Sequence, residues 1–209
     1  MNKKELKSTL LKQLAALMTK HGFEKRVYGQ SIKKPIENGT AKVHLAFIEH
    51  ENDFDVKVDV GIRFDELENM KNEHNMLLTA KERLNTSTIG VELGNISIGE
   101  PRRWTIKSKE DIDSVIQSIY DEIKMFLLPF VEKYSSRENV FDLCIKEDSE
   151  ANLICPLNGK RAINAIGLAI ILKKEDQLHE LIQTKRKYLE DKNDVGLPMY
   201  LSFIEKHKN

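Results

Sequence analysis

A strict alternation of apolar and polar residues runs from Asp53 to Phe64 and predicts a β-strand. The apolar positions are Phe54, Val56, Val58, Val60 and Ile62, and the positions between them are mostly charged. Period-two alternation places the two classes of side chain on opposite faces of a strand. One face of the expected sheet therefore enters a core, and the other holds charge, as antiparallel sheets allow.

Residues Lys42 to Glu49 alternate in the same way, and the short polar segment that follows predicts a hairpin between the two strands. A turn centred on residues 51–52 matches the apolar faces, whereas a slip by one residue would turn one face toward water. This register places His44 opposite Asp59. It also makes Val58 a central residue of the buried face.

Helical spacing of apolar residues predicts helices at both ends of the chain. The first ends at Gly22, and a long one opens at Ser108, with Pro129 expected to kink or end it near Leu128. Ser136 is expected to cap a short helix that follows. The other expected elements are strands at Arg26–Lys34, Ile89–Leu93 and Arg103–Ile106, an ambiguous helix at Asp65–Leu84 carrying Leu67, Met70, Leu77 and Leu84, and helices near Leu157–Lys173, Glu175–Glu190 and after Pro198.

Strands grouped between helices indicate an α+β fold rather than an alternating α/β fold. We expect an N-terminal helix, an antiparallel sheet of about four to five strands and C-terminal helical hairpins. Residues 1–107 would form the sheet region and residues 108–209 the helical region, packed together as one compact unit.

Charge and cysteine content narrow the function classes. Lys plus Arg and Asp plus Glu number 33 each, which argues against nucleic acid as a partner of the whole chain. No apolar run is long enough to span a membrane, and the N-terminal segment lacks a signal-peptide pattern. The two cysteines cannot form a disulfide framework, so a reduced, cytoplasmic protein is expected.

The polar face of the sheet is the first candidate site, with His44 and Asp59 as its candidate catalytic pair. An aspartate opposite a histidine can orient it as a general base. The alternatives are ordinary cross-strand charge pairs on a solvated face, or a face that a helix covers. The candidate binding residues on this face are Asp55, Lys57 and Arg63.

Arg103 and Trp104 form a second candidate binding site together with Arg102. Two arginines beside the only tryptophan suit a phosphate or a stacked base, although a core anchor with solvated arginines is the alternative. No His-x-x-x-His or Cys-x-x-Cys pair occurs, so neither a metal nor a cofactor is expected. Cys144 is expected in the core, and Cys155, which precedes a proline in a turn, is expected to be more accessible.

The segment from Leu6 to Phe23, which ends in His-Gly-Phe, resembles the opening of a bacterial domain-of-unknown-function family. Members of that family begin with a Lys/Leu helix ending in Gly-Phe, followed by a meander of strands. Residues 58–62 are similar to the end of that meander. Trp104 and the later Leu-Pro-Phe at 128–130 are similar to the family's Trp motif and long helix. The resemblance covers roughly the first two-thirds of the chain and implies an α+β fold in a bacterial cytoplasmic protein, without catalytic residues.

These observations favour a non-enzymatic module that binds a protein partner, as immunity proteins do when they neutralise toxins. The dense, balanced charge and the lack of a catalytic motif motivate this prediction. The alternative is an enzyme that uses His44 and Asp59 on a sheet face. Nucleic-acid binding through Arg102, Arg103 and Trp104 ranks last.

Overall fold

The computed structural model describes residues 2–73 and 78–207, and its contacts divide the chain into two units. Unit 1 comprises Met1–Ile62 and Gly90–Lys133, and unit 2 comprises Arg63–Ile89 and Tyr134–Asn209. Each unit is therefore built from two segments that are distant in sequence. The boundary expected near Ser108 lies inside unit 1.

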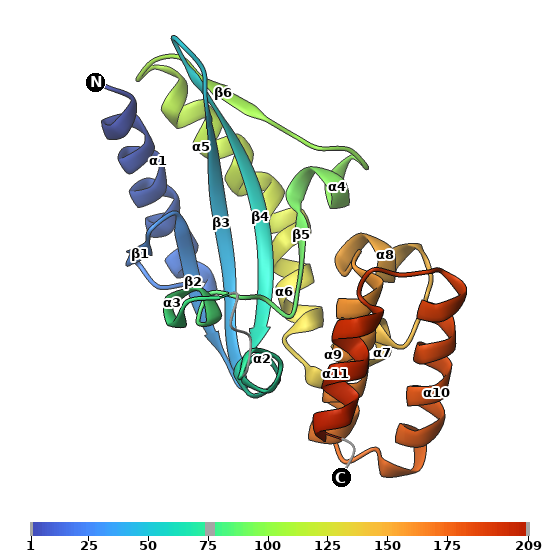
Figure 1. Cartoon of the computed structure of the whole chain (residues 1–209). Helices are drawn as coiled ribbons and strands as arrows, with labels where there is room; N and C mark the ends of the chain where they lie inside the picture. The colour runs from blue at the N-terminus through green and yellow to red at the C-terminus, as the bar shows by residue number, and fades with distance from the viewer. Residues whose placement is uncertain (1, 74–77, 208–209) are drawn as a thin grey trace. The chain divides into compact units, whose positions relative to one another are not determined.

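Unit 1 is built around a six-stranded sheet (Figure 1). The strands are β1 (Val27–Tyr28), β2 (Ser31–Ile36), β3 (Gly39–Glu49), β4 (Phe54–Phe64), β5 (Ile89–Glu92) and β6 (Trp104–Ile106). They lie in the order β1-β2-β3-β4-β5, with β6 beside the first residues of β4. The predicted α+β class with an antiparallel sheet is confirmed.

The hairpin of β3 and β4 forms as its alternation predicts. His50 N donates to Asp53 O at 3.1 Å, which closes the turn where the predicted register places it. Val43, Leu45 and Val58 are fully buried. The strand expected at Arg26–Lys34 is instead divided into β1 and β2, because Gly29 takes a left-handed conformation with φ of +64°.

The helices of unit 1 lie against the apolar side of this sheet. They are α1 (Lys3–Met18), η1 (Thr19–His21), α4 (Leu93–Ser97), α5 (Asp111–Glu122), η2 (Ile123–Leu127) and α6 (Leu128–Tyr134), the last residue of which falls in unit 2. Helices α1 and α5 contact each other, and Lys7 of α1 lies over the rings of Phe47 and Phe54. Asn2 caps α1, and Gly22 ends the helical segment in the predicted left-handed cap.

Pro129 does not end the long helix near Leu128. The helix passes through the π-helical segment η2, in which Leu128 N donates to the carbonyl of Ile123 five residues earlier. A proline ring collides with the carbonyl four residues before it and removes one donor. The wider π turn directly ahead of Pro129 accommodates that ring, and the helix continues to Tyr134.

Unit 2 is a cluster of helices centred on α9. Its helices are α2 (Asp65–Asn72), α3 (Ala80–Arg83), α7 (Arg137–Cys144), α8 (Ser149–Ile154), α9 (Asn158–Ile171), α10 (Glu175–Asp191) and α11 (Leu197–His207). Helix α9 contacts α2, α7, α10 and α11. The predicted C-terminal helical hairpins are therefore present, and Ser136 caps α7 as expected by accepting from Asn139 N. The segment expected as one ambiguous helix at Asp65–Leu84 contains the separate helices α2 and α3, and Leu77 lies outside the described residues.

Two glycines let neighbouring segments approach α9 closely. A Cβ at Gly159 would lie 2.7 Å from Gly196 Cα, at the start of α11, and a Cβ at Gly167 would lie 2.3 Å from a methyl carbon of Leu67 in α2. Leu67 itself is fully buried. Glycine at 167 thus makes room for the leucine that anchors α2 on α9. A helix long and apolar enough to cross a membrane does not occur in the part of the chain that the structure describes.

Candidate functional site

Polar side chains from five strands meet on the side of the unit 1 sheet opposite its apolar face. We call this the charged sheet face, and its members are Ser31, His44, Asp55, Lys57, Asp59, Glu92, Arg103 and Thr105. Alternation along β4 places the three β4 members there, because the residues between them are fully buried. The face contains both signs of charge.

Glu92 joins three groups on the charged sheet face. Its carboxylate accepts from Arg103 Nη1 at 2.6 Å and from Arg102 N at 3.1 Å, and it lies 3.5 Å from Lys57 Nζ. Lys57 Nζ also lies 3.1 Å from Asp59. Burial would lower the pKa of Lys57, but Asp59 and Glu92 outweigh it and raise the pKa. Opposite charges therefore hold these side chains in place.

His44 and Asp59 lie on this face but bind different partners. His44 Nδ1 lies 3.0 Å from Ser31 Oγ, on the adjacent strand where the β2–β3 register pairs the two residues. Asp59 is bound by Lys57. Burial lowers the pKa of His44, which Asp59 only partly offsets, so the ring is neutral at pH 7.

Asp55 is fixed at the end of the face where β6 joins β4. It accepts from Thr105 Oγ1 at 2.7 Å and lies 3.1 Å from His50 Nε2. The hydrogen bond from Thr105 lowers the pKa of Asp55, burial opposes this, and the bond with His50 lowers the pKa further.

The structure separates Arg103 from Trp104. Arg103 extends over the charged sheet face and is about one-third exposed at its side chain, 34%. Trp104 points to the other side, where it is buried and its indole Nε1 donates to Ser118 of α5 at 3.0 Å. A base needs an open ring face for stacking. Trp104 anchors the core instead.

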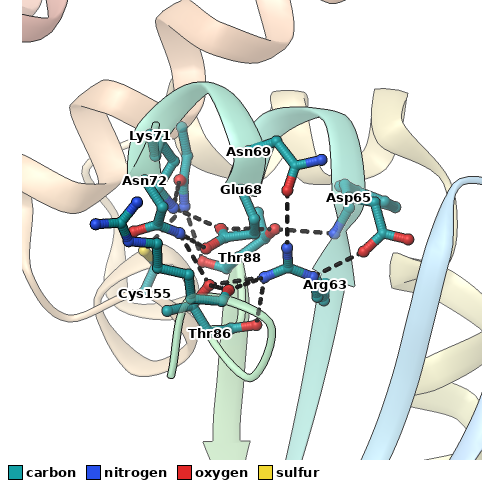
Figure 2. A network of polar contacts seen from close by, with 12 residues as sticks. Arg63, Asp65, Glu68, Asn69, Lys71, Asn72, Thr86, Thr88 and Cys155 are labelled. Carbon is teal, nitrogen blue, oxygen red and sulfur yellow. Dashed lines mark hydrogen bonds and ion pairs between the residues drawn. The ribbon is translucent and has the colours of Figure 1, made fainter. Parts of the chain in front are cut away.

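Arg63 belongs to unit 2 and is buried there. Its guanidinium donates to Thr86 Oγ1 at 2.7 Å, to the carbonyl of Arg83 at 3.0 Å and to Asp65 at 2.7 Å (Figure 2). These bonds fasten the segment after α3 to the start of α2. Arg63 therefore lies in a network that sequence analysis did not predict.

A buried carboxylate, Glu68, lies in that same network of unit 2. Its side chain is 1% exposed, and Lys71 Nζ lies 2.6 Å away, with Thr88 Oγ1 at 3.1 Å and Asn72 Nδ2 at 3.4 Å. Burial alone would raise the pKa of Glu68, but Lys71 and the hydrogen bonds lower it to about 2. The carboxylate is therefore charged inside the unit.

Asn164 connects this network to Cys155. Its Oδ1 accepts from Lys71 Nζ at 2.8 Å, and its Nδ2 donates to Thr88 O at 2.9 Å and lies 3.7 Å from Cys155 Sγ. Cys155 is 2% exposed, so its expected accessibility is wrong. In the sequence, Asn164 stands out as a lone amide inside the otherwise apolar run of α9.

A second ionic cluster in unit 2 surrounds Glu147, whose own side chain is 29% exposed. Arg161 and Lys185, both almost fully buried, each contact one of its carboxylate oxygens. The neighbouring Arg186 and Lys187 are exposed and pair with Glu190 and Asp191 one turn later. Lys185 is therefore buried, whereas the two residues that follow it in α10 are exposed to solvent.

Comparisons with known proteins give no indication of what these residues do. Comparisons of the chain with family models, with curated proteins and with solved structures found no match. Within residues 2–73 and 78–207, no group of three or more His, Cys, Asp or Glu side chains is placed to hold a metal ion. Function must therefore be inferred from the charged sheet face.

Proposed function

We propose that this chain is a non-enzymatic module that binds a protein partner through the charged sheet face, as immunity proteins bind toxins. The observation that carries the proposal is the fixed, part-exposed ionic network of Lys57, Asp59, Glu92 and Arg103. Charged groups held in place before binding lose little freedom when a partner arrives. Such groups favour specificity and fast association with a surface of complementary charge.

The distribution of charge supports a protein rather than a nucleic acid as the partner. Acidic and basic groups alternate on the face, whereas a nucleic-acid site gathers cations along one stripe. The resemblance to a bacterial family and the two reduced cysteines support placing the protein in the bacterial cytoplasm.

The test is an affinity measurement with matched charge reversals. Wild-type protein is used to recover a stoichiometric partner from native lysate, and the partner is then titrated with the variants. Arg103→Glu is expected to weaken binding by at least about tenfold, because it leaves Glu92 facing a like charge. Lys187→Glu, the same change at an exposed residue of α10, is expected to leave affinity unchanged. Recovery of no stoichiometric partner, or equal affinities of the two variants, would contradict the proposal.

Hydrolysis is a second candidate function, which the contact between Ser31 Oγ and His44 Nδ1 favours. A neutral histidine bonded to a hydroxyl can accept its proton as the oxygen attacks an acyl carbon. Turnover of an activated ester such as p-nitrophenyl acetate should then fall at least about tenfold in both Ser31→Ala and His44→Gln. Turnover that neither substitution changes excludes this function.

A further inference from the structure

A group of cations lies beside the charged sheet face, where β1 and β2 form one edge of the sheet (Figure 1). We call it the basic corner, and its members are Arg26, Tyr28, Lys33 and Lys42. Tyr28 pairs with Ser31 across β1 and β2, and Lys33 is two residues further along β2. Residues that pair directly, or that are two apart on one strand, share a side of the sheet. The basic corner therefore lies on the same side as the charged sheet face.

The ring of Tyr28 holds two cations at the basic corner. Arg26 Cζ lies 5.0 Å and Lys33 Nζ lies 4.9 Å from the centroid of this ring, within the range of cation–π attraction. The Tyr28 hydroxyl donates to the carboxylate of Glu24, which fixes the orientation of the ring. Both cations are therefore held in place before a ligand arrives, and they are held by an uncharged group.

The two cations on this ring have no acidic partner within residues 2–73 and 78–207. Neither Arg26 nor Lys33 forms an ion pair there, and the side-chain contacts of both are those with Tyr28. On the charged sheet face, by contrast, the Glu92 carboxylate contacts two cations. The positive charge that remains unpaired on this side of the sheet therefore gathers at the basic corner.

Lys33 and Lys42 oppose each other across β2 and β3, at a position that brings their side chains close. Leu45 N donates to Gln30 O at 2.9 Å, which makes those two residues a hydrogen-bonded pair. Such pairs recur at every second residue of an antiparallel ladder, so Lys33 and Lys42, three residues further on, form a pair without hydrogen bonds. The Cα atoms of such a pair lie about 4.5 Å apart, and like charges placed there are destabilising. An anion bound at this position would offset the repulsion.

We propose that an acidic segment of the partner, with Asp or Glu side chains, docks its carboxylates on Arg26, Lys33 and Lys42. This inference rests on the proposed function, because it names the chemistry of the partner that the charged sheet face binds. Charge complementarity selects the occupant, since unpaired cations lie at one edge of the surface and the carboxylates of Asp59 and Glu92 lie beyond them. A nucleic-acid strand carries phosphates along its whole length and would meet those carboxylates as well.

Titration of the full-length, ¹⁵N-labelled protein with an octaglutamate peptide tests the proposal without the natural partner. The amide signals of Lys33 and Lys42 should shift to saturation in the NMR spectrum, while that of Arg103 should stay in place. Added salt should weaken the binding, because the basic corner is exposed to screening. No saturable shift, or saturation centred on Arg103, would overturn the proposal.

A matched pair of charge reversals on β2 tests the role of the basic corner. Lys33→Glu should weaken binding of the peptide at least about tenfold, because a like charge replaces a cation. Lys34→Glu is the control, since Lys34 points to the other side of the sheet, over the ring of Phe23. Its effect should stay within about twofold, because solvent and salt screen charges that are not in contact. Equal affinities of the two variants would overturn the proposal.

A second reversal covers the case in which Lys33→Glu does not fold. Circular dichroism establishes the folded state, and Arg26→Glu, at an exposed residue, should weaken the peptide by a similar factor. An unchanged affinity in Arg26→Glu would count against the basic corner. A twenty-nucleotide oligothymidylate should bind no more tightly than the peptide at equal salt. Tighter binding of the oligonucleotide at the same residues would replace the acidic segment with a nucleic acid.

The recovered partner separates this inference from the proposed function. If Arg103→Glu weakens the partner and Lys33→Glu does not, the proposed function stands and the acidic segment is excluded. If both reversals weaken the partner and Lys34→Glu does not, both proposals are supported. Recovery of no partner contradicts the proposed function, and the peptide titration then decides by itself whether the basic corner binds carboxylates.

Discussion

At the scale of single residues, the charge on Glu68 is stabilised by its immediate neighbours. A buried carboxylate is unfavourable unless cations and donors replace the water that it has lost. Lys71, Thr88 and Asn72 supply these contacts, and Asn164 holds Lys71 from the other side. Loss of any one partner leaves the rest of the network with unsatisfied charge.

The depressed pKa of Glu68 makes stability depend on pH in acid. Its pKa falls from 4.5 to about 2 on folding, so its contribution is fully present above the unfolded value and is lost as pH falls toward 2. This contribution is about 3 kcal/mol. Urea denaturation measures the difference in unfolding free energy between wild type and Glu68→Gln. This difference should decrease by about 3 kcal/mol as the pH falls from above 4.5 to about 2. Glu180→Gln, at an exposed residue of α10, is the control, and a gap that stays constant for Glu68→Gln would contradict the prediction.

At the scale of elements, hydrophobic periodicity predicted the strands and helices in which one face is buried. The β3–β4 hairpin follows from alternation, because one slip in register would expose residues such as Val58. Helices α9 and α10 follow from helical spacing, and their bounds lie within two residues of those expected. The charged sheet face was predictable for the same reason, since it consists of the residues that alternate with the core.

Elements whose form depends on a distant segment could not be predicted. Asn164 and Gly167 interrupt an apolar run in the sequence. The fold explains both residues, because α2 places Lys71 beside Asn164 and Leu67 beside Gly167. The π turn before Pro129 is another case, because sequence rules indicate a break but not how the helix absorbs it. The buried position of Cys155 likewise depends on α9, which provides Asn164 and Arg161.

At the scale of the whole molecule, the chain builds each unit from two separate segments. The segment Arg63–Ile89 lies between two stretches of unit 1, yet its contacts described above belong to unit 2. It supplies Leu67, which fills the space beside Gly167, and Thr88, whose carbonyl binds Asn164. The helices after Lys133 therefore lack part of their core and part of their polar network without it.

Unit 2 is expected to fold by itself only when both of its segments are present. A chain in which a flexible Gly/Ser linker replaces Gly90–Lys133 and joins Arg63–Ile89 to Tyr134–Asn209 should unfold cooperatively in urea, whereas Tyr134–Asn209 alone should not. Leu67→Ala in the linked chain is the control and should cost about 2–5 kcal/mol, because it leaves a cavity against Gly167. Cooperative unfolding of Tyr134–Asn209 alone, with the same midpoint as the linked chain, would contradict the assignment of Arg63–Ile89 to unit 2. Such a result would mean that Leu67, Glu68 and Thr88 contribute nothing to the stability of the helices that they contact.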